Sequence, residues 1–318
     1  MFEAVVIGDP HLDKLTKIFH NAVTMQIAAI RAALQYAVDN NVHHAVILGD
    51  VAHYTSLSSE ATYGLFGLLT EFEDKLNIYV ITGNHDYAKE KHNALKFFRM
   101  LSEHGRLAVK FFVDEVRLDV GGVPLVFLPH PLTSTSAKNS LVFGHFSRPG
   151  ALRDNGTRMP SKALEPDTNI YVLGHLHTHQ VLNNSYFPGT LYQTNFGETP
   201  DKGFGHIKCK SIGGKLKFRY KQIPAVLPFE LKTVEVGEDT KLVNSDRVAY
   251  RVTTASDFVV PHDFYLKNPS VQFEYTPPNQ KSITESSTTI GLKDFLKSKG
   301  LTLPQLKRAK QLLDEVAL

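Results

Sequence analysis

Short runs of apolar residues that end in glycine recur five times in the first part of the chain. Each run is followed at once by a polar residue that can bind a metal ion. The glycine and the following polar residue are Gly8-Asp9, Gly49-Asp50, Gly83-Asn84, Gly144-His145 and Gly174-His175. A short apolar run bounded by such a turn predicts a buried strand that ends in a loop. We therefore predict five strands whose following loops carry the polar residues.

Helical patterns lie between these strands, at residues 24–38, 58–75 and 90–104. An alternation of strands and helices predicts the α/β class. Residues 111–129 form two alternating apolar runs about Gly121-Gly122, which predicts a hairpin, and residues 215–222 add a further strand pattern. The predicted sheet is therefore mixed rather than purely parallel.

The last third of the chain is predicted to be organised differently. Pro224 and Pro228 mark a boundary into residues 225–278, a small lobe with strand candidates at residues 248–253 and 271–275. Residues 279–290 are rich in Ser, Thr and Gln, which predicts a linker, and residues 291–318 predict a pair of amphipathic helices. Such a pair docks either on its own chain or on a partner, and the pattern leaves both open.

Composition narrows the class of protein. The chain has 318 residues, of which 42% are hydrophobic and 21% charged, as in soluble globular proteins, and its apolar runs are shorter than the roughly 20 residues that cross a bilayer. With a single cysteine, Cys209, and no secretory pattern at the amino terminus, we expect a cytoplasmic protein. The net charge of +3 is compatible with a polyanionic substrate.

The polar residues after the strands have the chemistry of a two-metal site. A carboxylate such as Asp50 can bridge two ions about 3.5–4 Å apart, and imidazoles and amide oxygens complete their coordination. This mixture of oxygen and nitrogen donors suits manganese, iron or zinc better than calcium or magnesium. The predicted ligands are Asp9, His11, Asp50, Asn84, His145, His175 and His177.

Two further histidines are predicted to act on the substrate. His85 directly follows Asn84, which is a position from which it can protonate a departing oxygen without binding an ion. His53 follows Asp50 by three residues and is predicted to face the same crevice.

The ordered series Asp-x-His, Gly-Asp-x-x-His, Gly-Asn-His-Asp, Gly-His and Gly-His-x-His resembles the calcineurin-like metallophosphoesterase superfamily over residues 1–224. Within it, the chain is similar to the nuclease subunits of SbcCD-type DNA double-strand-break repair complexes. The features that favour this branch are His53, residues 187–198, and the lobe with its terminal helices. The chain departs from the pattern at Asp13, where relatives commonly carry glycine.

The resemblance implies a fold of two packed mixed β-sheets flanked by helices (residues 1–224), with a small α+β capping lobe (residues 225–278). It implies two manganese ions, one held by Asp9, His11, Asp50 and His177, the other by Asp50, Asn84, His145 and His175. It also implies a homodimer made by helices at residues 58–75 and 90–104. The helices in residues 291–318 would bind an SMC-like coiled-coil ATPase.

The resulting hypothesis is a manganese-dependent DNA nuclease, both exonuclease and endonuclease, that acts in double-strand-break repair and recombination. One alternative is a metallophosphoesterase that acts on a small-molecule phosphodiester or a phosphoprotein, because the same metal site serves those reactions. A second alternative is a non-catalytic scaffold that recruits DNA or the ATPase. The sequence does not indicate which residues contact DNA.

Overall fold

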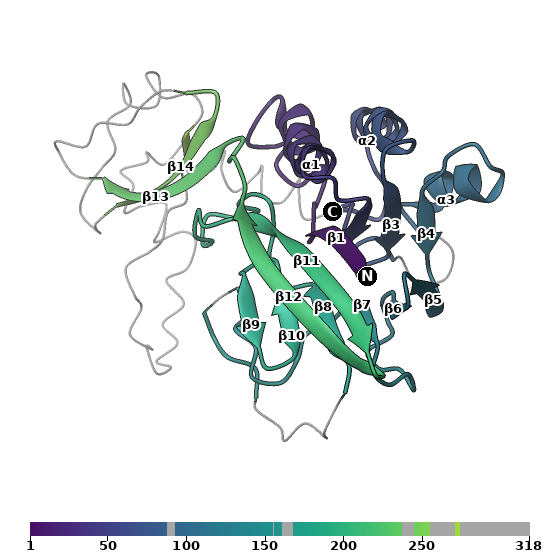
Figure 1. Cartoon of the computed structure of the whole chain (residues 1–318). Coiled ribbons are helices and arrows are strands. Elements are labelled where there is room, and N and C mark those ends of the chain that lie inside the picture. Colours follow the sequence, from purple (N-terminus) through teal and green to yellow (C-terminus); the bar gives the residue numbers. More distant parts are fainter. Residues whose placement is uncertain (88–92, 155, 161–167, 237–244, 255–270, 274–318) are drawn as a thin grey trace, which may run out of the picture. The chain divides into compact units, whose positions relative to one another are not determined.

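The computed structural model describes residues 1–87, 93–154, 156–160, 168–236, 245–254 and 271–273 (Figure 1). The first sheet has the strand order β12-β11-β1-β2-β3-β4. Its strands β1 to β4 are parallel, and β11 and β12 run antiparallel at one edge. The strands are β1 (Phe2–Ile7), β2 (His44–Ile47), β3 (Asn77–Ile81), β4 (Lys110–Phe112), β11 (Gly203–Ile212) and β12 (Lys215–Pro224).

The second sheet has the order β5-β6-β7-β8-β10-β9 and is also mixed. Strands β6, β7, β8 and β10 are parallel, whereas β5 and β9 are antiparallel to their neighbours. The strands are β5 (Val116–Val120), β6 (Val123–Leu128), β7 (Leu141–His145), β8 (Ile170–Gly174), β9 (Gln180–Leu182) and β10 (Ser185–Phe187).

The two sheets pack face to face, and helices cover the outer side of the first. Phe2 and Val46 of the first sheet share one buried cluster with Phe127 and Phe143 of the second. The apolar residues on the opposite face of the first sheet pack against three helices. These helices are α1 (Ala22–Asp39), α2 (Ser59–Phe72) and α3 (Lys96–Glu103), which Figure 1 shows above β1, β3 and β4. The predicted fold of two packed mixed sheets with flanking helices is confirmed.

Two predicted elements differ from those observed. The helix expected at residues 90–104 begins only at Lys96 within the described residues, because Asn93 Oδ1 accepts a hydrogen bond from the Leu95 backbone and holds a turn there. Residues 111–112 do not join the hairpin about Gly121-Gly122. They form β4 in the first sheet, where Phe111 pairs with Val80, so the hairpin is β5–β6 alone.

A third sheet follows β12 and contains the parallel strands β13 (Glu230–Val236), β14 (Val248–Thr254) and β15 (Val271–Phe273). The predicted strand at residues 248–253 is therefore confirmed, and that at 271–275 is described over 271–273. Phe229 and Leu231 belong to the buried cluster between the first sheet and its helices, so the third sheet begins at that core.

The capping role of residues 225–278 stays a prediction. The linker at 279–290 and the helices at 291–318 lie outside the described residues. Among the described helices, none combines the length and apolarity that a membrane span needs.

Candidate metal centre

All seven predicted ligands converge at one end of the two sheets. Three loops of the first sheet, after β1, β2 and β3, carry Asp9 with His11, Asp50, and Asn84. The second sheet contributes His145 at the end of β7, and His175 and His177 after β8. Because carboxyl ends of parallel strands meet at a common edge, residues far apart in sequence come together here.

The ligand atoms form two neighbouring groups. In the first, His11 Nε2 lies 3.1 Å from His177 Nε2, and Asp9 joins them within 4.8 Å. In the second, Asn84 Oδ1 lies 3.0 Å from His145 Nε2 and 2.9 Å from His175 Nδ1.

Asp50 lies between the two groups. Its Oδ2 atom is 3.7 Å from His11 Nε2 and 3.4 Å from His145 Nε2. This is the position required of a carboxylate that bridges two ions. The division of ligands implied by the resemblance is therefore compatible with the distances.

The residues present fit a pair of transition-metal ions. Two donor atoms about 2.1 Å from the same ion and at right angles to one another are about 3.0 Å apart, which matches the separations of the imidazole nitrogens and the Asn84 oxygen. His11 and His177 direct ring nitrogens at one another inside the protein, where each exposes less than a tenth of its surface. Neutral imidazole nitrogens that face each other without a proton repel, and a cation between them removes that repulsion.

The backbone is unusual at four of the seven ligands. Asp9 and His11 both have φ of 45°, Asp50 has 48° and His175 has 82°. Residues other than glycine rarely adopt this left-handed backbone conformation, although Asp and His adopt it more often than most. Such conformations cluster at functional sites, where the surrounding fold holds them.

Glycine at position 83 is required by the close approach of two ligand loops. A Cβ atom there would overlap the backbone nitrogen and a carboxylate oxygen of Asp50. Gly49, with φ of 89°, would place its Cβ only 2.7 Å from His145 Nδ1. The glycines that precede the ligands therefore allow the loops to pack against one another.

Hydrogen bonds lock the loops in place. The loop after β1 pairs with the loop after β2, through His11 N to Asp50 O at 2.8 Å. The buried carboxylate of Asp86 accepts from the backbone of Ala52 and Gly83, both at 2.9 Å, and so ties the loop after β2 to the loop after β3. Asp86, the last residue of Gly-Asn-His-Asp, therefore positions ligands.

Asp13, where the sequence departs from the family pattern, also has a structural task. Its φ of 74° is a backbone conformation that favours glycine, the residue that the family pattern implies at this position. Its carboxylate accepts from the backbone and hydroxyl of Ser58, each at 2.7 Å. Ser58 in turn caps α2 by accepting from Ala61 N, so Asp13 fixes the start of that helix.

The electrostatics of the site separate the charged from the neutral groups. Burial lowers the pKa of His175 to about 4 with the help of nearby His145, which leaves its imidazole neutral as a ligand must be. Burial opposes charge on His145 as well, but Asp50 and Asp9 outweigh it and raise the pKa of His145 to about 9. Burial raises the pKa of Asp50, yet His145 and His11 hold it below its ordinary value. Asp50 is therefore ionised at neutral pH.

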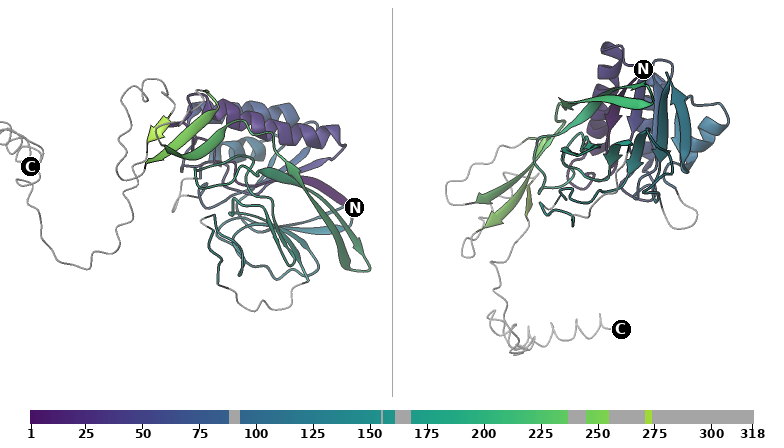
Figure 2. Two further views of the ribbon diagram at one scale, coloured as in Figure 1. Left: turned by 90° about the vertical axis from the view of Figure 1, so that its left-hand side faces the viewer. Right: turned by 60° about the horizontal axis from the view of Figure 1, so that its bottom comes forward.

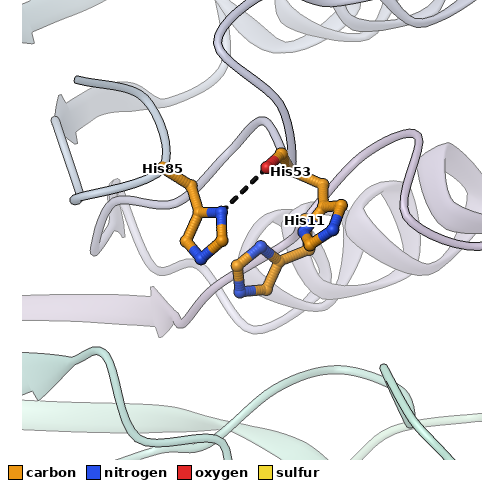
Figure 3. Close-up of side chains that lie close together, drawn as sticks. All are labelled: His11, His53 and His85. Atoms are coloured by element: carbon orange, nitrogen blue, oxygen red, sulfur yellow. Dashed lines mark hydrogen bonds between the residues drawn. The ribbon is translucent and has the colours of Figure 1, made fainter. Parts of the chain in front are cut away.

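The two predicted substrate histidines lie beside His11 (Figure 3). Their rings are stacked, with centroids 5.1 Å apart, and the His85 ring meets that of His11 edge-on at 4.8 Å. His85 Nδ1 is 2.8 Å from the backbone oxygen of His53, so Nδ1 carries the proton and donates it. His85 Nε2 takes no part in this hydrogen bond. Burial lowers the pKa of the neighbouring His53 to about 4.

Sequence reasoning missed several residues that support the ligands. Glu198 Oε1 accepts from His177 Nδ1 at 2.9 Å and Glu198 Oε2 pairs with buried Lys202 at 2.7 Å. Asp154 Oδ1 accepts from the His177 backbone at 2.8 Å. Glu198 ends the segment 187–198 noted above, but Asp154 follows no apolar run and the sequence contains no signal for it.

A cavity of about 440 Å³ adjoins the ligands. Its lining includes four predicted metal ligands, Asp50, Asn84, His175 and His177, together with the predicted proton donor His85 and the exposed Arg153. A guanidinium group beside residues that can bind two metal ions is suited to binding a phosphate group.

The fold and the ligand set define a metal-dependent phosphoesterase. A model of the calcineurin-like phosphoesterase family matches residues 3–189, which is more than half of the chain. The chain therefore belongs to that family, whose members are hydrolases that use divalent metal ions. A search of curated proteins finds no match.

Proposed function

We propose that this chain is a manganese-dependent DNA nuclease, with exonuclease and endonuclease activity, that acts in double-strand-break repair together with an SMC-like ATPase. The observation that carries the proposal is the position of Asp50 Oδ2 between two donor groups, with His85 beside them and a cavity in front. When bound, two divalent ions supply positive charge to the phosphate and make water a better nucleophile.

The residues of the chain perform the remaining steps. Asp50 and the other ligands would hold the cations beside the phosphate, and Arg153 in the cavity lining adds a further positive charge for a non-bridging oxygen. His85, oriented by the carbonyl of His53, donates a proton to the leaving sugar oxygen. His53 stacks on His85 and so also limits the rotation of its ring.

Manganese-dependent hydrolysis of labelled substrates tests this function. Duplex and single-stranded DNA are compared with a cyclic nucleotide and with the generic ester bis(p-nitrophenyl) phosphate. The proposal expects cleavage of DNA, whereas activity confined to the small esters would favour the alternative of a small-molecule phosphodiesterase. An Asp50→Asn variant is the control, since loss of the bridging carboxylate should abolish metal-dependent cleavage of every substrate.

An exposed apolar surface on α2 and α3 supports the proposed homodimer. Tyr63 is 77% exposed and Phe97 50%, and together with Phe66 they line a groove of about 330 Å³. Met100 of α3 is also exposed, at 47%. A Tyr63→Glu, Phe97→Glu variant should be monomeric by light scattering, near 35.5 kDa. Val226→Glu is the matched control, because Val226 is 83% exposed but lies outside this surface. A wild type that is already monomeric would exclude the dimer.

The proposed ATPase contact is tested by deleting residues 289–318. This truncation should abolish association with an SMC-like ATPase in a pull-down and keep manganese-dependent cleavage of short DNA. If cleavage is lost as well, these residues are needed for folding. If association persists, the partner binds elsewhere.

A further inference from the structure

The hairpin formed by β11 and β12 has one face that is almost entirely basic. Alternate residues of a strand share a face, and directly paired residues of an antiparallel ladder also share it. Lys208 pairs with Arg219 and Lys210 pairs with Lys217, so the basic residues of the two strands lie together. The face carries six exposed cations: Lys208, Lys210, Lys215, Lys217, Arg219 and Lys221.

The opposite face of the hairpin belongs to the core between the sheets. Ile207 and Cys209 are fully buried there, and Leu216, Phe218 and Tyr220 pack against the same cluster. The two faces are therefore fixed by burial, and the cations cannot turn inward. Figures 1 and 2 show β11 and β12 running side by side to their shared turn at the edge of the first sheet.

The positive charge of this basic face is poorly balanced. Glu3 on the neighbouring strand pairs with Lys208 at 2.8 Å. Among the residues that the structure describes, no carboxylate lies within ion-pair distance of the other five cations. Like charges directly opposite in a ladder destabilise a sheet, and the pairs Lys210 with Lys217 and Lys208 with Arg219 are of this kind. A bound polyanion would remove the repulsion.

The spacing of the cations suits the backbone of a nucleic-acid duplex. The four cations of β12 occupy every second position over residues 215–221, a length of about 20 Å at about 3.4 Å per residue. Over about 20 Å, one strand of a duplex presents roughly six phosphates. A row of this length exceeds what a single small anion would need.

The side chains on this face favour a duplex over the other polyanions. Single strands bind to exposed aromatic platforms, but Phe218 and Tyr220 of β12 face the core instead. Membrane surfaces are bound by apolar residues beside the cations, and the exposed apolar residue of this hairpin is Ile212 alone, next to the turn.

Most of the basic face lies away from the metal centre. Gly205 of β11 pairs with Val6, close to the ligand loop, whereas Cys209 pairs with Phe2 at the other end of β1. Lys210 is five residues beyond Gly205, which corresponds to about 17 Å along the strand. A duplex on the Lys210 and Lys217 end of this face would thus be held at a distance from the reacting phosphate, while Lys221, which pairs with His206, marks the end of the face nearer the ligand loop.

We propose that the basic face of the β11–β12 hairpin binds the phosphate backbone of duplex DNA and holds the duplex outside the active site. This inference rests on the proposed nuclease function and adds a second contact to it. The contact is independent of base sequence, because it recognises only phosphates.

The test replaces three cations of the face in the full chain, Lys210→Gln, Lys217→Gln and Arg219→Gln. A matched control replaces three exposed lysines elsewhere, Lys75→Gln, Lys110→Gln and Lys138→Gln, and changes the net charge equally. Binding of a fluorescent 30-base-pair duplex is measured in EDTA at several salt concentrations. Each lost phosphate contact lowers the slope of log affinity against log salt by about 0.9, so we expect a slope smaller by roughly 2–3 and affinity lower by about tenfold or more. The control should stay within about twofold of wild type.

Equal binding and equal slopes for the face variant and wild type would overturn the inference, as would an equal loss in the control. Vesicles with phosphatidylserine form another arm. If the face variant loses vesicle binding but keeps duplex binding, the surface is a membrane contact and the inference fails. If the triple variant does not fold, Lys217→Gln alone should still lower the slope by about 0.9.

The failure of this inference can be distinguished from failure of the proposed function. Manganese-dependent hydrolysis of bis(p-nitrophenyl) phosphate should be equal in wild type and the face variant, because the changed residues lie away from the ligands. If wild type cleaves DNA but the face variant binds duplex normally, only the inference is wrong. If wild type cleaves the small ester and not DNA, the nuclease function itself is wrong.

Discussion

Replacing Glu198 with Gln tests whether this carboxylate holds His177 in position as a metal ligand. Glu198 is 7% exposed and accepts from His177 Nδ1 at 2.9 Å, from Thr194 Oγ1 at 2.6 Å and from Lys202 Nζ at 2.7 Å. Since His177 Nδ1 donates to Glu198, the lone pair is on Nε2, the atom that faces His11 at 3.1 Å. Gln keeps the size of the side chain and removes its charge.

Two effects of different size are expected from Glu198→Gln. Loss of a partner behind a metal-bound histidine typically lowers metal affinity or activity 10–100-fold, which corresponds to about 1.4–2.7 kcal/mol. In addition, the Lys202 side chain is 1% exposed and loses its counter-ion. Breaking a buried pair costs about 3–5 kcal/mol of stability, so the metal-free variant should also melt earlier.

A double variant separates the two effects. Glu198→Gln with Lys202→Met removes the unpaired charge, so stability should recover while manganese affinity stays low. Isothermal titration with Mn²⁺ gives the affinity, and thermal unfolding of the metal-free protein gives the stability. Wild-type manganese affinity in both variants would refute the reasoning and leave Glu198 as the counter-ion of Lys202 only.

The pH dependence of Glu198→Gln gives a further check. Burial raises the pKa of Glu198, but hydrogen bonds and charges of His177 and Lys202 outweigh it and hold the pKa below the ordinary value. A carboxyl group with a lowered pKa stabilises the folded state above the ordinary glutamate pKa of about 4.3, and this contribution is lost as the pH falls through the folded value. The wild type should therefore lose more stability than the variant between pH 5 and pH 3.

Three further predictions concern the proton donor, the loop contact and the site charge. His85→Asn should lower DNA cleavage by about 10²–10⁴-fold and keep metal content by elemental analysis; loss of metal would instead make His85 a ligand. Gly83→Ala should abolish manganese binding because its Cβ overlaps Asp50, whereas Gly67→Ala, which meets nothing within 4 Å, should bind normally. Because the pKa of His145 is raised to about 9, mainly by Asp50 against the effect of burial, bound ions must displace its proton. Manganese affinity should then rise from pH 6 to pH 8 with proton release in calorimetry, and a pH-independent affinity would contradict this.

The convergence of the seven predicted ligands could be predicted from the sequence because metal-ligand residue types recur after glycine-terminated apolar runs. Buried strands of an α/β fold have a strong local signal, and their carboxyl ends meet regardless of the loops between them. The order of the strands in the two sheets thus brings the seven predicted ligands together, and the strands themselves are predicted by the pattern of apolar residues. The assignment of each ligand to a particular ion stays a prediction.

The features that the sequence did not predict all depend on contacts between segments that are distant along the chain. Phe111 joins the first sheet through Val80, a pairing that the local alternation of residues 111–129 does not reveal. Asp154 lies in a loop and reaches His177 through a backbone hydrogen bond. The roles of Glu198 and Lys202 depend on burial, which converts two ordinary surface residue types into one ion pair.

The predicted metal ligands come from both sheets, Asp9, His11, Asp50 and Asn84 from one and His145, His175 and His177 from the other. Ions bound there would join the two layers of the protein, in addition to the apolar cluster between them. A ligand present at 100 times its dissociation constant adds about 2.7 kcal/mol of stability. The melting temperature should therefore rise with the free concentration of metal. Scarcity of the ion would shorten the lifetime of the folded chain as well as prevent catalysis.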